Sequence, residues 1–499
     1  MLSQLPPNLI AIDAFWAKFR KGELSPVEVI RDRCFEQGKA PDYDVIICGG
    51  SLGILFACAL QIRGWRVVVI EKNVLQGREQ EWNISQSELN SLLELELMTP
   101  GELDRVITTV YNPGRIAFHG GSEFWVKDIL NLGVSPRLLI EQVKQRFLRG
   151  GGIILEYTQF HTGVVFQNSV AVTVVQQGGK LTLTGKVLVD AMGHFSPIVQ
   201  QFYANQADSV CMVVGGCADG LPDYSYGDLI YTFTPALPDQ SGKLRQYFWE
   251  AFPAHDGRTT YLFVYLQKSN WDLSFQELWQ TYISLLPQYQ QAEPANIQLH
   301  RQLMGFFPAY KNSPLVPKFN RLLFVGDSSG MQSPLSFGGF GAMLRHLPRL
   351  TEGLHLALSD NYLTQADLKL LLPYQPNLAV TWLFQQAMSN PSDPDQINRL
   401  MNCTFQVMSK LGPQVITPFL KDTVQFLPLS LTMLNMMWTD PLLILNVMGT
   451  VGINSLLAWL KHYLSLAYYH FVSEFPASSP ENFYQLVQQQ ALLYGSGRR

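Results

Sequence analysis

Residues 45–53 read Val-Ile-Ile-Cys-Gly-Gly-Ser-Leu-Gly, an apolar run that ends in a cluster of glycines. Residues 54–64 then carry apolar side chains at helical spacing, and residues 67–71 read Val-Val-Val-Ile-Glu. An apolar run, a glycine turn, a helix and a second apolar run within about thirty residues predict a β-α-β unit. The backbone N–H groups at the start of such a helix bind phosphate, and glycines allow the phosphate to approach. The stretch therefore predicts a nucleotide-binding fold.

The glycine pattern differs from the common G-x-G-x-x-G fingerprint. When Gly50 and Gly53 are aligned with its second and third glycines, Cys48 stands in place of the first. Glu71 follows 21 residues after Gly50, where the fingerprint carries the carboxylate that binds the ribose hydroxyls. Arg78 is a candidate ligand of the pyrophosphate, and a surface arginine is an equally good interpretation. The residues assigned to the dinucleotide from this region are Gly49, Gly50, Ser51, Leu52, Gly53, Glu71, Lys72 and Arg78.

Two later segments repeat the arrangement of an apolar run followed by a polar turn. Residues 162–189 predict a β-meander that ends in Asp190, and residues 321–325 predict a strand that ends in Gly326-Asp327. With the first segment, they resemble the glutathione-reductase-like FAD superfamily of the hydroxybenzoate-hydroxylase and geranylgeranyl-reductase type. The resemblance implies that all three segments bind one FAD, that Asp327 binds the ribityl chain, and that a glycine turn abuts the flavin ring. The residues it adds to the site are Asp190, Gly193, Gly326, Asp327, Pro334, Gly338, Gly339, Phe340 and Gly341.

The composition excludes several classes of function. Hydrophobic residues make up 47% of the 499 residues and charged residues only 15%, below the roughly 25% of ordinary soluble domains, so apolar surface is expected to remain for a membrane or a lipid-like substrate. A net charge of −4 without a basic cluster makes nucleic acid an unlikely partner. The six cysteines form no CxxC pair, so neither a disulfide framework nor a metal site is assigned. The N-terminus lacks the apolar core of a secretory signal, and export is not expected.

The pattern predicts an α/β fold with an α+β second domain. Residues 1–40 are expected to form a helical extension, because Ser25-Pro26-Val27-Glu28 has the composition of a helix start. A discontinuous FAD-binding domain is expected over 41–205 and 318–355, with an antiparallel-sheet substrate domain over 206–317. Residues 356–499 are expected to form an apolar helical region associated with a membrane.

The membrane expectation rests on residues 423–472. Residues 423–439 and 441–460 carry no charge, but prolines, glycines and asparagines interrupt them. Helices that lie in the membrane interface therefore fit better than a span. A helical domain buried against the rest of the protein is an equally weighted alternative. The sequence does not indicate an oligomeric state.

The chain carries four longer distinctive stretches, at residues 77–85, 128–136, 247–253 and 333–341. They resemble one family, the CruA and CruP lycopene cyclases of cyanobacteria, green sulfur bacteria and plastids, with a length closer to CruP. The resemblance implies a lycopene or related carotenoid substrate, a thylakoid or other photosynthetic membrane, reduced FAD with NADPH as reductant, and a bound chlorophyll a. No chlorophyll ligand is assigned, since His346, His355, His462 and His470 are more often ordinary helix residues.

Glu250 is the candidate proton donor. The cyclisation that the resemblance implies starts when an acid protonates the linear end group, and it ends in a β-ring without net redox change. A carboxyl buried in the aromatic strand 247–252 would have a raised pKa and stay neutral, although a position on the solvent face is nearly as well supported. Glu79 and Glu81 are the alternative donors. The residues expected to contact the substrate are Trp82, Phe248, Trp249 and Phe252.

Two other classes of function stay open. One is a different flavoenzyme, an isoprenoid reductase or a monooxygenase, which would consume NADPH in proportion to its product. The other is a protein that keeps the cyclase fold and binds carotenoid or chlorophyll for photoprotection or assembly.

Overall fold

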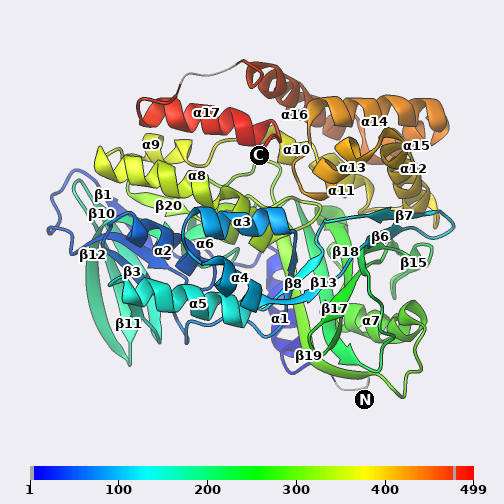
Figure 1. The fold of residues 1–499 in the computed structure, drawn as a ribbon, viewed down its shortest axis with the longest axis horizontal. Coiled ribbons are helices and arrows are strands. Elements are labelled where there is room, and N and C mark those ends of the chain that lie inside the picture. Colours follow the sequence, from blue (N-terminus) through cyan, green and yellow to red (C-terminus); the bar gives the residue numbers. More distant parts are fainter. Residues whose placement is uncertain (1–4, 476–478) are drawn as a thin grey trace.

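The computed structural model describes residues 5–475 and 479–499, and it contains two large sheets and a layer of helices (Figure 1). The eight-stranded sheet lies on the left of Figure 1, the seven-stranded sheet on the right, and the C-terminal helices run along the top. The chain is a mixed α/β protein, as the sequence predicts.

The eight-stranded sheet contains the predicted β-α-β unit and the predicted meander. Strands β2 (Tyr43–Cys48) and β3 (Val67–Ile70) pair in parallel and are joined by α2 (Gly53–Ile62). Their inner residues are buried on both faces of the sheet, which explains why the runs are continuously apolar. The sheet has the order β1-β10-β11-β12-β2-β3-β9, with β20 beside β12. Its other strands are β1 (Ile30–Arg33), β9 (Ile153–Leu155), β10 (Thr158–Phe166), β11 (Val170–Gln176), β12 (Gly179–Asp190) and β20 (Leu322–Phe324).

The seven-stranded sheet has the order β19-β13-β18-β17-β14-β6-β7 and is antiparallel except for the parallel pair β14–β6. One face packs against α1 (Leu9–Arg20) and α7 (Phe275–Gln290) around Trp16, Trp249 and Trp279. Its strands are β6 (Gly114–Ala117), β7 (Glu123–Val126), β13 (Ser209–Asp219), β14 (Gly227–Tyr231), β17 (Phe248–Ala254), β18 (Gly257–Gln267) and β19 (Gln298–Ala309).

The N-terminal forty residues differ from the expected helical extension. The helix is α1, which ends before Ser25, and the predicted helix start at Ser25 is wrong. The backbone N–H groups of Val29 and Ile30 donate to Gln201 Oε1 at 2.8 Å, and β1 joins the edge of the eight-stranded sheet beside β10. Pairing with a distant strand therefore overrides the local helix signal.

The segment 41–205 contributes strands to both large sheets, because β6 and β7 belong to the seven-stranded sheet. The same segment also forms a small three-stranded sheet, in the order β4-β8-β5. The other elements of this segment are β4 (Trp82–Ile84), α3 (Gln86–Glu94), α4 (Pro100–Val106), β5 (Ile107–Val110), β8 (Leu132–Val134), α5 (Pro136–Arg149) and α6 (Pro197–Tyr203). Later in the chain come a separate two-stranded sheet, β15 (Leu237–Pro238) with β16 (Leu244–Arg245), and the 3-10 turns η1 (Lys268–Asn270) and η2 (Gly326–Ser329).

The chain after β20 is helical, as predicted. Within the described residues no single helix is long and apolar enough to cross a bilayer, and α15 with α16 reaches that length only as a pair bent by 105°. The helices are α8 (Gly339–Ser359), α9 (Gln365–Leu370), α10 (Pro376–Ala379), α11 (Trp382–Ala387), α12 (Gln396–Leu411), α13 (Pro413–Leu420), α14 (Phe426–Thr439), α15 (Pro441–Val451), α16 (Ile453–Val472) and α17 (Phe483–Gly495).

Candidate flavin site and the aromatic face beside it

A groove of about 520 Å³ lies at the carboxyl ends of the parallel strands β2, β3, β12 and β20. Ligands of open α/β sheets bind at this edge, and the volume lies within the usual range of ligand pockets. The structure brings the three predicted segments together in this one groove. The predicted residues that line it are Gly49, Gly50, Ser51, Leu52, Gly53, Glu71, Lys72, Gly193, Gly326 and Asp327.

The glycine turn leaves no room for side chains. Gly49 has a φ of +99°, and a Cβ there would overlap the carbonyl of Ala191. A Cβ on Gly50 would lie 2.6 Å from Leu75 Cδ1. The backbone N–H of Gly50 donates to Glu71 Oε2 at 2.8 Å, which fixes the carboxylate at the groove. The turn therefore presents bare backbone and one carboxylate, the groups that bind a dinucleotide.

Asp190 stands behind the groove and does not line it, contrary to its assignment as a cofactor ligand. Its side chain is fully buried and accepts hydrogen bonds from the Met192 N–H at 3.0 Å, from Ser328 Oγ at 3.2 Å and from Ser196 Oγ. Burial raises its pKa to about 6. Because Ser328 belongs to the third segment, Asp190 joins the second and third segments to each other and has a structural role.

Asp327 lies at the end of the groove, against the first turn of α8. A Cβ on Gly339 would be 2.5 Å from Asp327 Oδ1, so the helix start and the carboxylate are in direct contact. His194 Nε2 is 4.0 Å from Asp327 Oδ2, and burial lowers the pKa of this imidazole. Sequence reasoning missed His194, although its place directly after Gly193 in the second segment was a usable signal.

Arg78 does not reach the groove. Its Nε donates to the Gln80 carbonyl at 3.2 Å, and its guanidinium lies 5.7 Å from the centre of the Trp82 ring. A Cβ on Gly77 would overlap the backbone of Pro136, and this close approach fixes where the loop turns away from the groove. Trp82 in turn stacks on Phe340 of α8 with a centroid distance of 4.4 Å.

The second face of the seven-stranded sheet is aromatic, and Glu250 lies on it. Side chains alternate between the faces of a strand, so Phe248, Glu250 and Phe252 of β17 share one face. The β17–β18 register pairs Phe248 with Phe263 and Glu250 with Tyr261. The rings of Phe248 and Phe263 stack at 5.5 Å. Phe248 and Phe252 therefore lie on the same strand face as Glu250, and their contact with a substrate stays a prediction.

Trp249 is the exception. It points to the opposite face, where its ring lies 4.4 Å from that of Tyr289 and 5.7 Å from that of Tyr282 on α7. The period of two along β17 requires this, since Trp249 adjoins Glu250 in the chain. Trp249 is therefore a core residue of the α7 side, and its assignment as a substrate contact is wrong.

Glu250 is a part-buried carboxyl with a raised pKa. Asn83 Nδ2 donates to its Oε1. Burial raises the pKa of Glu250 to about 7, and the hydrogen bond from Asn83 and the charge of Arg78 oppose this rise only in part. The hydroxyls of Tyr111 and Tyr261 beside it are buried without a hydrogen-bond partner in the described residues. The sequence left open which face of the strand is inside, and the structure places Glu250 inside.

The two alternative donors are ion-paired. Glu79 is exposed and lies 2.5 Å from Arg137. Glu81 is buried, with Oε2 3.1 Å from Arg301 and Oε1 2.5 Å from His255 Nδ1. Glu81, His255 and Asp256 bring potential metal ligands together, but Arg301 contacts both carboxylates and already supplies the positive charge.

The loop that follows Asp327 connects the groove with the aromatic face. The Phe337 ring lies 5.8 Å from Phe307 and 6.1 Å from Tyr265, and Tyr265 Oη donates to the Leu335 carbonyl at 2.5 Å. A Cβ on Gly305 of β19 would meet no atom within 4 Å, so the face has open space at that point. The chain therefore runs from Asp327 at the groove to Phe337, which packs on the aromatic face.

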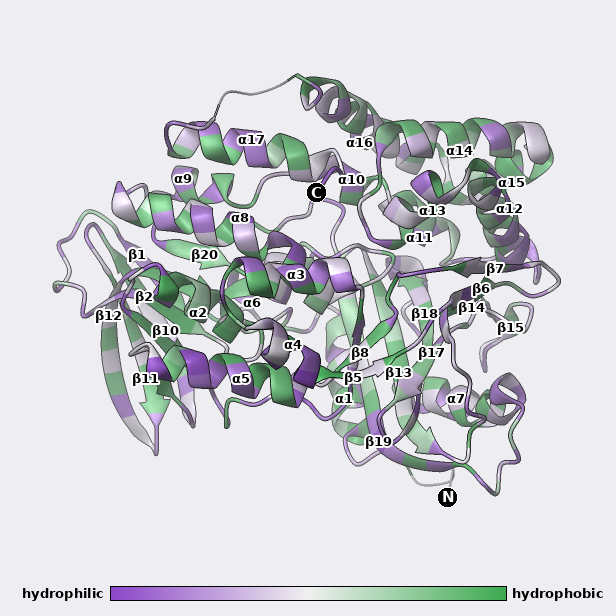
Figure 2. Cartoon of the chain, viewed as in Figure 1, coloured by the Kyte–Doolittle hydropathy of each residue, from purple (hydrophilic) through white to green (hydrophobic). Residues whose placement is uncertain are grey.

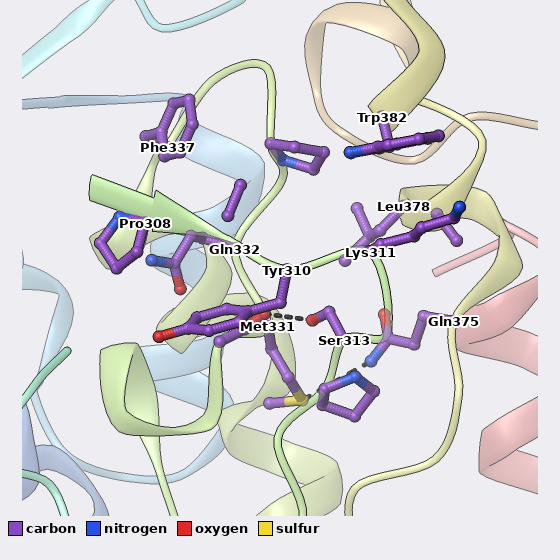
Figure 3. Close-up of a pocket in the computed structure, with 15 residues that line it drawn as sticks. Pro308, Tyr310, Lys311, Ser313, Met331, Gln332, Phe337, Gln375, Leu378 and Trp382 are labelled. Atoms are coloured by element: carbon purple, nitrogen blue, oxygen red, sulfur yellow. Dashed lines mark hydrogen bonds between the residues drawn. The ribbon is translucent and has the colours of Figure 1, made fainter. Parts of the chain in front are cut away.

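A narrow pocket lies at the far end of this loop (Figure 3). It encloses about 20 Å³, room for about one water molecule. Phe337 and Pro308 of β19 form one side, and Leu378 and Trp382 of α10 and α11 form the other. Pro334 also lines the pocket. The predicted cofactor residue Pro334 thus lines this pocket rather than the groove.

The histidines considered as chlorophyll ligands lie in the helices as expected, and three of them have internal partners. The Nδ1 atoms of His346 and His355 lie 3.0 Å from Arg349 Nε and 3.1 Å from Trp65 Nε1, respectively. His462 Nδ1 lies 2.5 Å from the Tyr374 hydroxyl. A chlorophyll site stays a prediction without an assigned ligand.

No family model and no curated protein sequence matches the chain. Among solved structures, the chain resembles a geranylgeranyl bacteriochlorophyll reductase-like protein from Thermoplasma acidophilum, with a TM-score of 0.59, 13% identity, and 84% of this chain and 100% of the other covered. The halogenase PltM, also solved in complex with FAD, gives a TM-score of 0.55 at 12% identity, with 90% of this chain and 95% of the other covered. A flavoprotein/dehydrogenase from Cytophaga hutchinsonii gives 0.52 at 13% identity, with 72% and 91% covered. At these identities the comparisons show the fold, and it is one that FAD-dependent enzymes use.

Proposed function

We propose that this protein is an FAD-dependent enzyme that protonates a carbon–carbon double bond of a long isoprenoid, with Glu250 as the proton donor. The observation that carries the proposal is a part-buried carboxyl on the aromatic face of the seven-stranded sheet, with its pKa raised to about 7. An acid with this pKa is half protonated at neutral pH, which suits general acid catalysis.

The groove fits FAD. Its bare glycine turn at the start of α2 suits the pyrophosphate, the fixed carboxylate of Glu71 suits the ribose, and Asp327 at the groove's end suits the ribityl chain. A bound flavin supplies hydride from NADPH or, when reduced, a negative charge near the substrate. The remaining steps belong to the chain's own side chains.

The aromatic rings around Glu250 have two roles in the proposed reaction. They keep water from the positively charged carbon that protonation creates, and their negative ring faces stabilise that charge. Asn83 holds the carboxyl group of Glu250 through its hydrogen bond to Oε1, so the acidic oxygen has a defined direction. Glu250 then delivers its proton to the double bond.

Two reactions can follow protonation, and they differ in electron balance. In reduction, the cation would receive a hydride that NADPH supplies through a bound flavin, so the product would gain two hydrogens and one NADPH would be consumed. In cyclisation, a neighbouring double bond attacks the cation and a proton leaves, so the product is an isomer. The fold comparison favours reduction, because the neighbour with the TM-score of 0.59 is reductase-like. The sequence resemblance favours cyclisation of lycopene or a related carotenoid.

One experiment separates these reactions. The flavin-loaded protein is incubated without oxygen with NADPH and either lycopene or a geranylgeranyl substrate, and product mass and NADPH loss are measured together. A product heavier by two hydrogens with equal NADPH loss identifies a reductase, and an isomeric product without matching loss identifies a cyclase. An oxygenated product formed only in air identifies a monooxygenase. Tight pigment binding without conversion contradicts the proposal and identifies a binding protein.

A further inference from the structure

The outer face of α14, α15 and α16 exposes a continuous set of large apolar side chains, which we call the outer apolar face. Trp438 is 87% exposed. On α16 the exposed residues recur every three to four positions, so they form one stripe along the helix. Figure 2 shows apolar residues along these helices at the edge of the molecule. The members are Leu427, Leu431, Leu434, Met437, Trp438, Leu442, Leu445, Met448, Ile453, Leu457, Leu460, Leu464, Tyr468 and Phe471.

The opposite side of the same helices packs on the protein. The buried residues on this side are Leu429, Met436, Leu443 and Leu466. Each of the three helices therefore has apolar side chains on the side that faces the core and on the side that faces outward. Between 423 and 460 the only charged residue is Asp440, which caps α15 by accepting from the Leu443 N–H at 2.9 Å. Soluble proteins seldom expose apolar patches of this extent without a partner.

We propose that the outer apolar face inserts into the hydrocarbon edge of one leaflet of a lipid bilayer. The bend of 105° between α15 and α16 prevents the pair from crossing the membrane as one rod, but it suits helices that lie along the surface. Lys461, which is exposed near Leu460 and Leu464, is the single Lys, Arg, Asp or Glu within these three helices, whereas a protein interface has a polar rim. A lipid surface therefore fits better than a second copy of the chain.

The position of the face over the narrow pocket also favours lipid. Trp459 Nε1 of α16 donates to the Val380 carbonyl at 2.9 Å, and Val380 joins α10 to α11, which form one wall of the pocket. The opposite wall includes Phe337, which contacts the face that carries Glu250. The inference deepens the proposed function and rests on it for the substrate: the leaflet would be the source of the isoprenoid.

The inference is tested by flotation of the flavin-loaded full chain with phosphatidylcholine vesicles, without substrate. The wild-type protein is expected to float with the vesicles at low and at high salt, because attachment through uncharged side chains is not screened. The variant Leu434→Glu/Trp438→Glu/Leu457→Glu is expected to bind at least about 10-fold more weakly, since it places three charges in the hydrocarbon region.

The matched control replaces three exposed apolar residues elsewhere, Ile10, Val27 and Phe35, which are 82%, 66% and 97% exposed, with glutamate. It is expected to float like the wild type, and the flavin content of both variants shows that they are folded. A wild-type protein that does not float, and instead forms a dimer that the triple variant dissociates, overturns the inference in favour of a second copy. Binding only to anionic vesicles, lost in salt, overturns it as well. Because no substrate is present, failure here is distinct from failure of the proposed chemistry.

Discussion

The Glu250→Gln variant removes the titrating proton of this side chain but keeps its size and shape. In the wild type the pKa of Glu250 is raised from 4.5 to about 7 by burial. The folded protein therefore holds a proton that the unfolded chain releases above pH 4.5. The associated stability is fully present below pH 4.5 and is lost as pH rises through 7. The difference between these pKa values corresponds to about 3 kcal/mol of unfolding free energy.

Glutamine has no titrating proton, and its side-chain oxygen can still accept from Asn83 Nδ2. The unfolding free energy of the wild type relative to Glu250→Gln should therefore decrease by about 3 kcal/mol between pH 4.5 and pH 8. Urea denaturation of both proteins at several pH values measures this difference, and other groups, such as Asp190, cancel in the comparison.

The same variant should lose about 10²–10⁴-fold of the proposed activity while it keeps its flavin. The wild-type rate should fall as pH rises above 7, because only the protonated acid acts. A free-energy difference that does not change with pH would refute the buried, neutral state of Glu250. Undiminished product formation by Glu250→Gln would refute its role as proton donor.

Three further predictions concern the groove and the sheet. Asp327→Ala should lose most of its bound flavin, measured by absorbance after desalting, and full occupancy would show that the third segment does not bind it. Gly50→Ala should also weaken flavin binding, because its Cβ would lie 2.6 Å from Leu75 Cδ1 and displace the turn; unchanged affinity in a flavin titration would contradict this. Trp249→Ala should lower the unfolding free energy by about 3–5 kcal/mol because it empties a core position against α7, whereas Phe263→Ala, on the face of Glu250, should mainly raise KM for the substrate. Equal effects of these two variants on KM would contradict the separation of the two faces.

Much of the nucleotide groove was predictable from local sequence. The strands before Gly49 and Asp190 are apolar on both faces, and the spacing from Gly50 to Glu71 equals one β-α-β unit, so the pattern along the chain indicates both the elements and the ligands. The meander was equally clear, because its alternation and its turns depend on neighbouring residues.

The aromatic face depended on tertiary structure. Alternation along β17 shows that Glu250 and Trp249 point to opposite sides, but it does not show which side is covered by α7 and which by the loop at Phe337. The ion pair of Glu81 was not predictable either, because its partner, Arg301, lies 220 residues away in the chain.

The sequence by itself determined the β-α-β unit, the three segments of the groove and the apolar character of 423–472, because periodicity, turn residues and charge content are local properties. Only the tertiary structure decided that Asp190 stands behind the groove, that Glu250 is inside, and that α14–α16 direct apolar side chains outward as well as inward. Burial, and with it the pKa of a carboxyl or the exposure of a leucine, is determined by which distant elements pack against a residue. That information is absent from the residue's immediate neighbours in the chain.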